Sequence, residues 1–259
     1  EEIAVTNSRI DGLEAKFNDY EAGGFSETTT ASFATDFVLG SVDGSTESEA
    51  LQAGYSFGMK LATSFTGDDA LKIAFDAGNS KAGTLDEFGK NNTTDDQLIL
   101  DGISYTFPLG DSITAFVGDS VDGSMLFNTA CVYGGPSDTL DDCGNVSAAI
   151  GKGSKTAAGA SYGFGNGLEA AVGYTGGATG LGTLENSDAY AGQLSYSAES
   201  YGVSVTYGII DQATVPHGAD NNDFSVNKYT ALNAYYTPEG LPSISLGYEI
   251  GDLGGAEAS

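Results

Sequence analysis

The chain has 259 residues, of which 38 are glycine and 17% are charged. Glycine is about twice its usual share and charge is well below the usual share, which excludes a coiled-coil rod and a charge-rich disordered chain. The 36 acidic against 9 basic residues give a net charge of −27, which would repel a phosphate backbone and excludes nucleic acid as a partner. No apolar run reaches the roughly 18 residues of a membrane helix, so helical spanning is excluded and β-barrel spanning is not.

The first twenty residues carry an apolar stripe that the rest of the chain lacks. Apolar residues recur at alternating spacings of three and four from Ile3 to Tyr20. This spacing is a heptad pattern, although a single amphipathic helix that caps a domain would show the same stripe. Gly23 and Gly24 then end the helix. We therefore expect a coiled-coil helix over residues 1–22, through which copies of the chain associate.

From Thr28 onward the pattern changes to a period of two, which is typical of β-strands. Between Leu51 and Phe65, for example, the odd positions are mostly large and apolar, and the even positions are polar or small. Runs of this kind are separated by segments rich in Gly, Asp, Asn and Ser. They predict eleven strands near residues 28–39, 51–65, 71–79, 97–107, 113–118, 155–164, 168–175, 189–198, 201–210, 228–236 and 242–250.

The connections between these strands alternate strictly between tight and long. The tight ones are 66–70, 108–112, 165–167, 199–200 and 237–241, and the long ones are 40–50, 80–96, 119–154, 176–188 and 211–227. The lengths also keep apolar residues on one face of each hairpin, because the two-residue turn at Glu199 and Ser200 joins an even-numbered apolar set to an odd-numbered one. Tight turns at one end and long loops at the other are typical of outer-membrane barrels. The N-terminal helix enters at the tight-turn end, which would be periplasmic.

Alternation alone fits both a soluble sandwich and a membrane barrel, because each has one apolar and one polar face. The polar face here is made mainly of Gly, Ala, Ser and Thr, which favours a pore lining over a water-facing sheet. Aromatic residues near the strand ends would form interfacial girdles; they are Phe65, Phe107, Tyr162, Phe164, Tyr201 and Tyr236. The fourth run is irregular, since Asp101 falls on its apolar side. We expect an all-β, antiparallel transmembrane barrel, and the alternative is a soluble or surface-attached β-rich binding or adhesion protein with acidic loops.

Six charged residues fall on the polar face and are the candidates for lining a pore: Asp36, Lys60, Lys72, Asp76, Glu169 and Glu249. If Phe65 faces Leu71 across the second turn, Lys60 faces Asp76. An exposed pair of this kind contributes only about 0–1 kcal/mol, so the two charges belong to water whether or not they interact.

The 119–154 connection is the longest and contains both cysteines of the chain, Cys131 and Cys143. They lack the further Cys or His ligands of a zinc site, so a disulfide is expected. Such a bridge would order the loop, contribute about 3 kcal/mol and let the loop fold into the lumen as a constriction. The charged residues of this constriction loop are Asp119, Asp122, Asp138, Asp141, Asp142 and Lys152. Their acidic balance predicts a preference for cations; calcium binding is the alternative role of the aspartates.

The sequence contains no recognisable set of catalytic residues, and neither a metal nor another cofactor is expected. The stretch from Gly151 to Thr156 has Gly after Lys152, where a phosphate-binding loop needs Ser or Thr. His217, the only histidine, lies in a long connection without a nucleophile in a recognisable elbow. The chain is therefore not expected to be an enzyme.

Three segments resemble the cyanobacterial outer-membrane porins whose surface-layer-homology domain is joined to the barrel by a coiled coil. They are VTNSRIDGLEA at residues 5–15 running into FSETTT at 25–30, TSFTG at 63–67, and YTFPLGDS at 105–112. The resemblance implies a trimeric, carbohydrate-porin-related barrel of about 16 strands in the outer-membrane lipid, which passes ions and small solutes; some members are labelled iron uptake porins.

The chain departs from that family in two respects. The surface-layer-homology domain is absent, and residues 256–259 do not form a strand that ends on an aromatic residue. An odd number of strands does not close a usual bacterial barrel, so residues 25–259 are expected to be a porin domain that is incomplete at its C-terminus.

Overall fold

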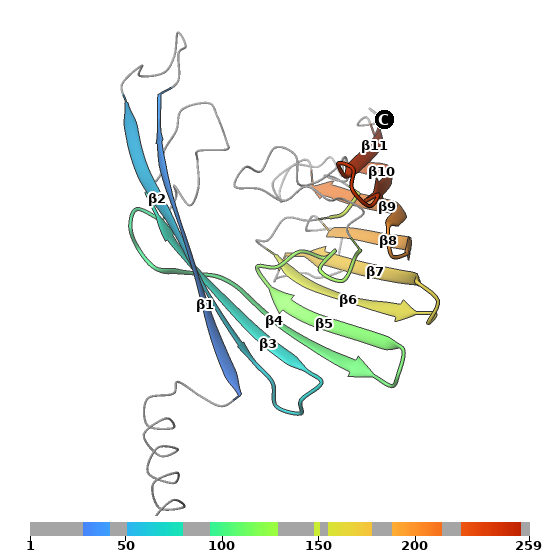
Figure 1. The fold of residues 1–259 in the computed structure, drawn as a ribbon, viewed down its shortest axis with the longest axis horizontal. Helices are drawn as coiled ribbons and strands as arrows, with labels where there is room; N and C mark the ends of the chain where they lie inside the picture. The colour runs from blue at the N-terminus through green and yellow to red at the C-terminus, as the bar shows by residue number, and fades with distance from the viewer. Residues whose placement is uncertain are drawn as a thin grey trace, which may run out of the picture.

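The computed structural model describes residues 28–41, 51–79, 94–128, 148–150, 155–177, 188–213 and 224–254. Within them the chain is all-β, and eleven strands form one antiparallel sheet in chain order (Figure 1). The strands are β1 (Thr29–Gly40), β2 (Gln52–Thr63), β3 (Ala70–Gly78), β4 (Ile99–Leu109), β5 (Ile113–Asp119), β6 (Thr156–Gly163), β7 (Leu168–Gly176), β8 (Asp188–Ser197), β9 (Tyr201–Ala213), β10 (Phe224–Tyr236) and β11 (Ile244–Leu253). Each of the eleven predicted strands is confirmed. The helix predicted over residues 1–22 lies outside the described residues.

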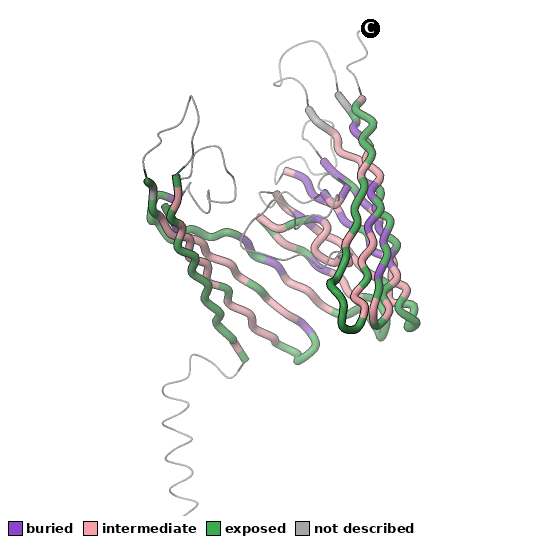
Figure 2. Tube along the Cα trace, turned by 45° about the horizontal axis from the view of Figure 1, so that its top comes forward, coloured by how far each residue is buried: buried purple, intermediate pink, exposed green. Residues whose placement is uncertain are grey.

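The sheet is strongly curved and its two edges stay apart. Each strand pairs with its neighbours in sequence, and among the described residues β1 pairs only with β2 and β11 only with β10. Figure 2 shows the result as a curved wall that is open on one side. The described part of the wall is therefore not closed into a barrel. No helix in this part of the chain is long and apolar enough to cross a bilayer.

The two faces of the wall have opposite chemistry, as the period of two predicts. Large apolar side chains occupy the convex face and are exposed there; among them are Val117, Val172, Leu194, Val203, Leu232, Leu246, Tyr248 and Ile250. Small and polar side chains occupy the concave face, and many are buried; among them are Ser104, Gln193, Ser195, Ser204, Thr206, Asn227 and Asn233. Val172 is 60% exposed, whereas Thr206 is 0% exposed. The burial pattern is the reverse of that in a soluble sheet.

A β-bulge in β4 explains the irregular fourth run of the sequence. Ala74 pairs with Gly102, but the next residue, Phe75, pairs with Leu100, so Asp101 is an extra residue without a partner on β3. A bulge of this type shifts the alternation by one and re-aims a side chain. Leu100 and Ile103 consequently share the convex face despite their opposite parity, and Asp101 lines a cavity on the concave side.

The register between β2 and β3 differs from the one expected. Thr63, not Phe65, lies opposite Leu71, so Lys60 pairs with Ala74 and Asp76 pairs with Gly58. Lys60 and Asp76 remain on one face as diagonal neighbours. The shift is an even number of residues, which is why it leaves every side chain on its predicted face.

The longer turn that causes this shift is organised by Asp69. Its Oδ1 accepts hydrogen bonds from the Ser64 hydroxyl at 2.7 Å, from the Phe65 and Thr66 amides at 2.9 and 2.8 Å, and from the Thr66 hydroxyl at 2.8 Å. Its Oδ2 accepts one from the Tyr105 hydroxyl on β4 at 2.7 Å. The Ser64 and Tyr105 hydroxyls, followed by the Thr66 donors, hold the pKa of Asp69 well below its usual range, although burial opposes them.

Replacing Asp69 with Asn should loosen this turn, because an amide oxygen cannot form five charge-assisted hydrogen bonds. We expect amide hydrogen exchange over residues 64–69 at neutral pH to accelerate by about an order of magnitude in D69N. The pKa of Asp69 is lowered on folding, so its stabilisation is complete above the unfolded pKa of about 4 and is lost as the pH falls through the folded pKa. Protection in the parent should therefore decline on acidification, and that of D69N should not. D68N, at the exposed neighbouring aspartate, is the matched control; equal exchange in D68N and D69N would contradict the assignment.

Candidate functional site

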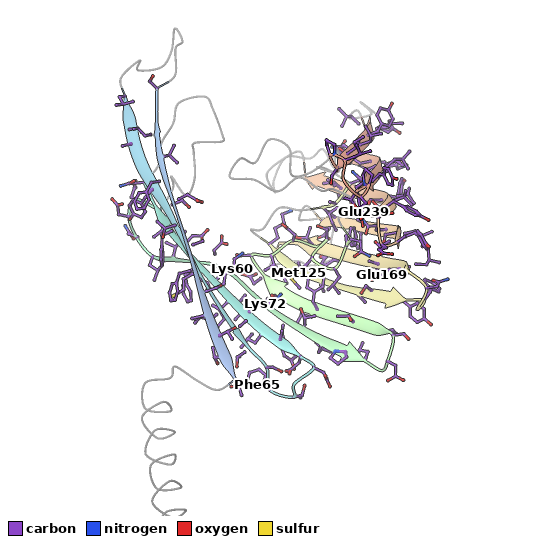
Figure 3. The ribbon with its side chains drawn as sticks, viewed as in Figure 1. Lys60, Phe65, Lys72, Met125, Glu169 and Glu239 are labelled. Atoms are coloured by element: carbon purple, nitrogen blue, oxygen red, sulfur yellow. The ribbon has the colours of Figure 1, made fainter. Side chains whose placement is uncertain are left out.

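The concave face carries all six charged residues that the sequence places on the polar side. The pairing register puts Asp36, Lys60, Lys72, Asp76, Glu169 and Glu249 on this face. Figure 3 shows Lys60 and Lys72 on the β2–β3 part of the wall and Glu169 near the beginning of β7, beside the tight turn from β6. Of the three lysines in the described strands, Lys60 and Lys72 are concave, and Lys228 shares the convex face with Ile209.

The two described ends of the 119–154 connection lie against the concave face. We call residues 120–128 and 148–150 the inward segment. The Asn128 amide donates to Gln193 Oε1 at 2.6 Å, and Asn128 Nδ2 donates to Ser195 Oγ at 2.8 Å. The Ala148 amide donates to Glu249 Oε2 at 2.9 Å. These three bonds fix the inward segment to β8 and β11, far from the strand β5 that it follows.

Apolar packing reinforces these hydrogen bonds. Ile150 of the inward segment is buried with Ala189 and Ala191 of β8, and Phe127 and Ile210 pack against the same cluster. Full burial of an Ile side chain such as that of Ile150 typically contributes about 1.5–3 kcal/mol. The apolar core of the described chain therefore lies between the concave wall and the inward segment.

Two glycines let the backbone of the inward segment approach the wall. A Cβ at Gly173 on β7 would overlap the carbonyl oxygen of Gly123. A Cβ at Gly208 on β9 would lie 2.7 Å from the carbonyl oxygen of Ala148, closer than real Cβ contacts come. Backbone and backbone therefore meet directly at both places, which is a common role of glycine in a strand.

The charged residues predicted for the constriction separate into three groups. Asp122 is exposed in the inward segment and lines a cavity. Asp119 has a different placement from the expected one, because it ends β5 in register with Ile103 of the convex face and accepts a hydrogen bond from Thr156 Oγ1 at 3.0 Å. Asp138, Asp141, Asp142, Lys152, Cys131 and Cys143 lie outside the described residues. The disulfide stays a prediction.

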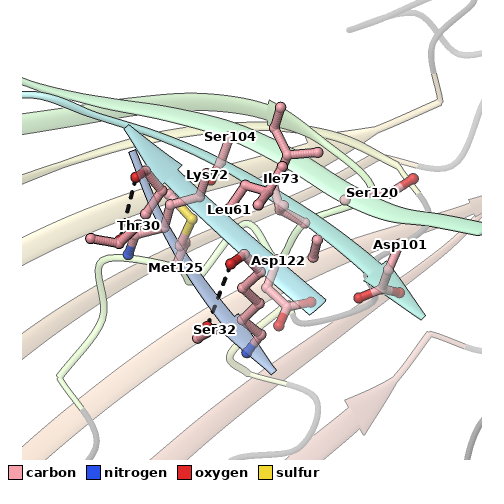
Figure 4. A pocket seen from close by; sticks show the side chains of 15 residues that line it. Thr30, Ser32, Leu61, Lys72, Ile73, Asp101, Ser104, Ser120, Asp122 and Met125 are labelled. Atoms are coloured by element: carbon pink, nitrogen blue, oxygen red, sulfur yellow. Dashed lines mark hydrogen bonds between the residues drawn. The ribbon is translucent and has the colours of Figure 1, made fainter. Parts of the chain in front are cut away.

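A cavity of about 550 Å³ lies between the inward segment and the β1–β4 part of the wall (Figure 4). Lys60 and Lys72 line it from the wall, Asp101 from the bulge, and Asp122 and Met125 from the inward segment. Sequence reasoning did not assign Asp101 to a site, although a charge on an apolar face is a signal for a bulge. It also missed Asn128 and Gln193, for which the sequence carries no signal.

No group of three or more His, Cys, Asp or Glu side chains in the described part of the chain could hold a metal ion. His217 lies outside the described residues. In comparisons with known proteins, no family model and no curated protein matches the chain.

Gln193 should be the residue on which the docking of the inward segment depends most. It accepts from the Asn128 amide and donates through Nε2 to Thr206 Oγ1 at 3.0 Å, and it is itself buried. We expect Q193A to weaken docking by about 1–3 kcal/mol, because the half-buried Asn128 amide loses its acceptor. Hydrogen exchange of residues 120–128 should rise about 5- to 150-fold. Q97A, at an exposed glutamine before β4, is the control, and unchanged protection in Q193A would show that docking does not need this bond.

Proposed function

We propose that this sheet is the wall of a transmembrane β-barrel, and that the protein is an outer-membrane porin for ions and small hydrophilic solutes. The observation that carries the proposal is the reversed burial pattern of the two faces. Convex side chains such as Leu194 and Leu246 are 47% and 70% exposed, and no second sheet among the described residues covers them. Hydrocarbon lipid is the environment in which such a face is favourable, with the polar face turned to a lumen.

The aromatic residues near the tight turns support the same environment. Phe65 and Tyr105 lie 6.3 Å apart, Tyr105 and Phe107 lie 5.4 Å apart, and the rings of Tyr162 and Phe164 meet edge to face at 4.8 Å. Aromatic rings at the rim of an apolar band are typical of the membrane interface. The strands contain 7 to 13 residues, and about 9–11 residues are needed to cross a bilayer at the usual tilt.

The edges of β1 and β11, which pair with no further strand among the described residues, indicate how the barrel would be completed. Further strands would have to join these two edges, because an open edge cannot face lipid. The family resemblance suggests about 16 strands in total, in a homotrimer assembled through the coiled coil at residues 1–22. In this arrangement the tight turns face the periplasm and the long connections face the exterior.

The position of the inward segment favours a pore with a constriction over an unobstructed pore. It is fixed to the concave wall by hydrogen bonds and apolar packing, so it occupies part of any lumen that the wall encloses. Charges at such a narrowing act on passing ions more strongly than charges in open water. Asp122 and the acidic residues at 138, 141 and 142 give this connection a negative balance, and cation preference follows.

A charge on the convex face tests the membrane environment directly. Val172 lies at the centre of β7 and is exposed, so V172R would be nearly neutral in a soluble sheet. In a bilayer we expect it to reduce the free energy of unfolding by about 2–4 kcal/mol, measured by urea titration of the chain folded into lipid vesicles. S32R, on the exposed concave side, is the control and should cost less than about 1 kcal/mol. A neutral V172R in a chain that stays dispersed without detergent would favour the adhesion-protein alternative.

Planar-bilayer recording tests the transport activity. We expect single channels whose reversal potential in a salt gradient indicates cation preference, and weaker preference in D138N/D141N/D142N because three negative charges are removed. The absence of channel currents after addition of the protein would overturn the porin assignment. Anion preference in the parent, or an unchanged triple variant, would overturn only the role of the connection.

A further inference from the structure

We propose that the cavity between the inward segment and the β1–β4 wall is a binding site for small zwitterions that carry one carboxylate and one ammonium group, the class of free amino acids. The proposal rests on the porin function insofar as it takes the concave face to be a solute pathway. It goes beyond passive diffusion, because it assigns a ligand class to particular side chains.

The positive half of the site consists of Lys60 and Lys72. They are diagonal neighbours on β2 and β3, since Lys60 pairs with Ala74 and Lys72 with Ala62, and both line the cavity. Lys60 also interacts electrostatically with Asp76 on the same face, and Lys72 has the uncharged residues Ala62 and Ser104 as its cross-strand neighbours. In a protein with 36 acidic and 9 basic residues, two adjacent lysines on a polar wall concentrate positive charge where a carboxylate can bind.

The negative half comes from the bulge in β4. Asp101 is the unpaired extra residue there, and its carboxylate lines the same cavity as the two lysines. Asp122 lines the cavity from the inward segment, as Figure 4 shows together with Asp101. A solute with only a negative charge would meet these carboxylates as well as the lysines. A zwitterion can satisfy both halves.

Hydroxyl groups on β1, beside the lysines and on the side away from Asp101, supply neutral acceptors. Thr30 and Ser32 donate to the carbonyl oxygens of Ala62 and Lys60 at 3.4 and 3.5 Å, the two dashed lines in Figure 4, so their oxygen lone pairs remain available to an ammonium group. The described residues that line the cavity include no aromatic ring and so offer no stacking platform for a sugar. The volume of about 550 Å³ is in the usual range for small-molecule sites.

A saturation-transfer NMR titration of the detergent-solubilised full chain would test the site with three probes: L-alanine, acetate and ethylamine. We expect saturable alanine binding in about the millimolar range, at least about tenfold tighter than either half-probe. The variant K60M/K72M should weaken alanine binding at least about tenfold, K60R/K72R should restore it, and K228M on the convex face should leave it unchanged. D101N should weaken alanine binding and strengthen acetate binding, because it removes an attraction for one probe and a repulsion for the other.

Several results would overturn the assignment. These are the absence of saturable alanine binding, unchanged affinity in K60M/K72M, or acetate that binds as tightly as alanine. Single-channel recording from the same preparation separates this outcome from failure of the porin function. Conducting channels without alanine binding would overturn the site alone, whereas alanine binding in a chain that forms no channel would support the site and overturn the porin.

Discussion

Antiparallel pairing that keeps opposed residues on the same face is the constraint on which the rest of the structure depends. Through ten successive pairings, every apolar run meets an apolar run, and the polar residues form one continuous surface. A slip of one residue at any pairing would turn a whole strand over, placing its large side chains among buried polar groups. The concave polar surface, the cavity and the docking of the inward segment all exist because no such slip occurs.

Within this constraint, the inward segment provides the core that an isolated sheet of this polarity lacks. Ile150 of the segment, which is 3% exposed, is buried against Ala189 and Ala191 of β8, whereas the side chains buried on β3 and β10 are the smaller Ala77 and Ala231. The remaining apolar surface is on the outside. The described chain therefore obtains little stability in water from its convex face, which is consistent with a chain that is stabilised by lipid.

Much of the wall could be predicted from the sequence, because alternation and turn length are local signals. The strand positions and the two faces followed from them, and an error of two residues in the β2–β3 register changed no face. The error arose because the turn that Asp69 organises is longer than expected; its contact with Tyr105 on β4 joins distant segments, which a local pattern does not show. Asp101 was visible as an anomaly but could not be placed until the bulge was located. The bonds from Asn128 to Gln193 and Ser195 join residues more than 60 positions apart, and nothing in the sequence foretells them.

The close approach at Gly173 and Gly208 has a consequence for how this wall could change over time. In the proposed barrel, the inward segment can lie close to the wall because Gly173 and Gly208 have no Cβ atom, and this close packing sets the width of the pore that remains beside the segment. A single methyl group at either one would push the segment's backbone toward the centre of the lumen and narrow the passage. Permeability could then be adjusted without altering any charged residue, so the size limit and the ionic preference of the channel are controlled by separate parts of the sequence.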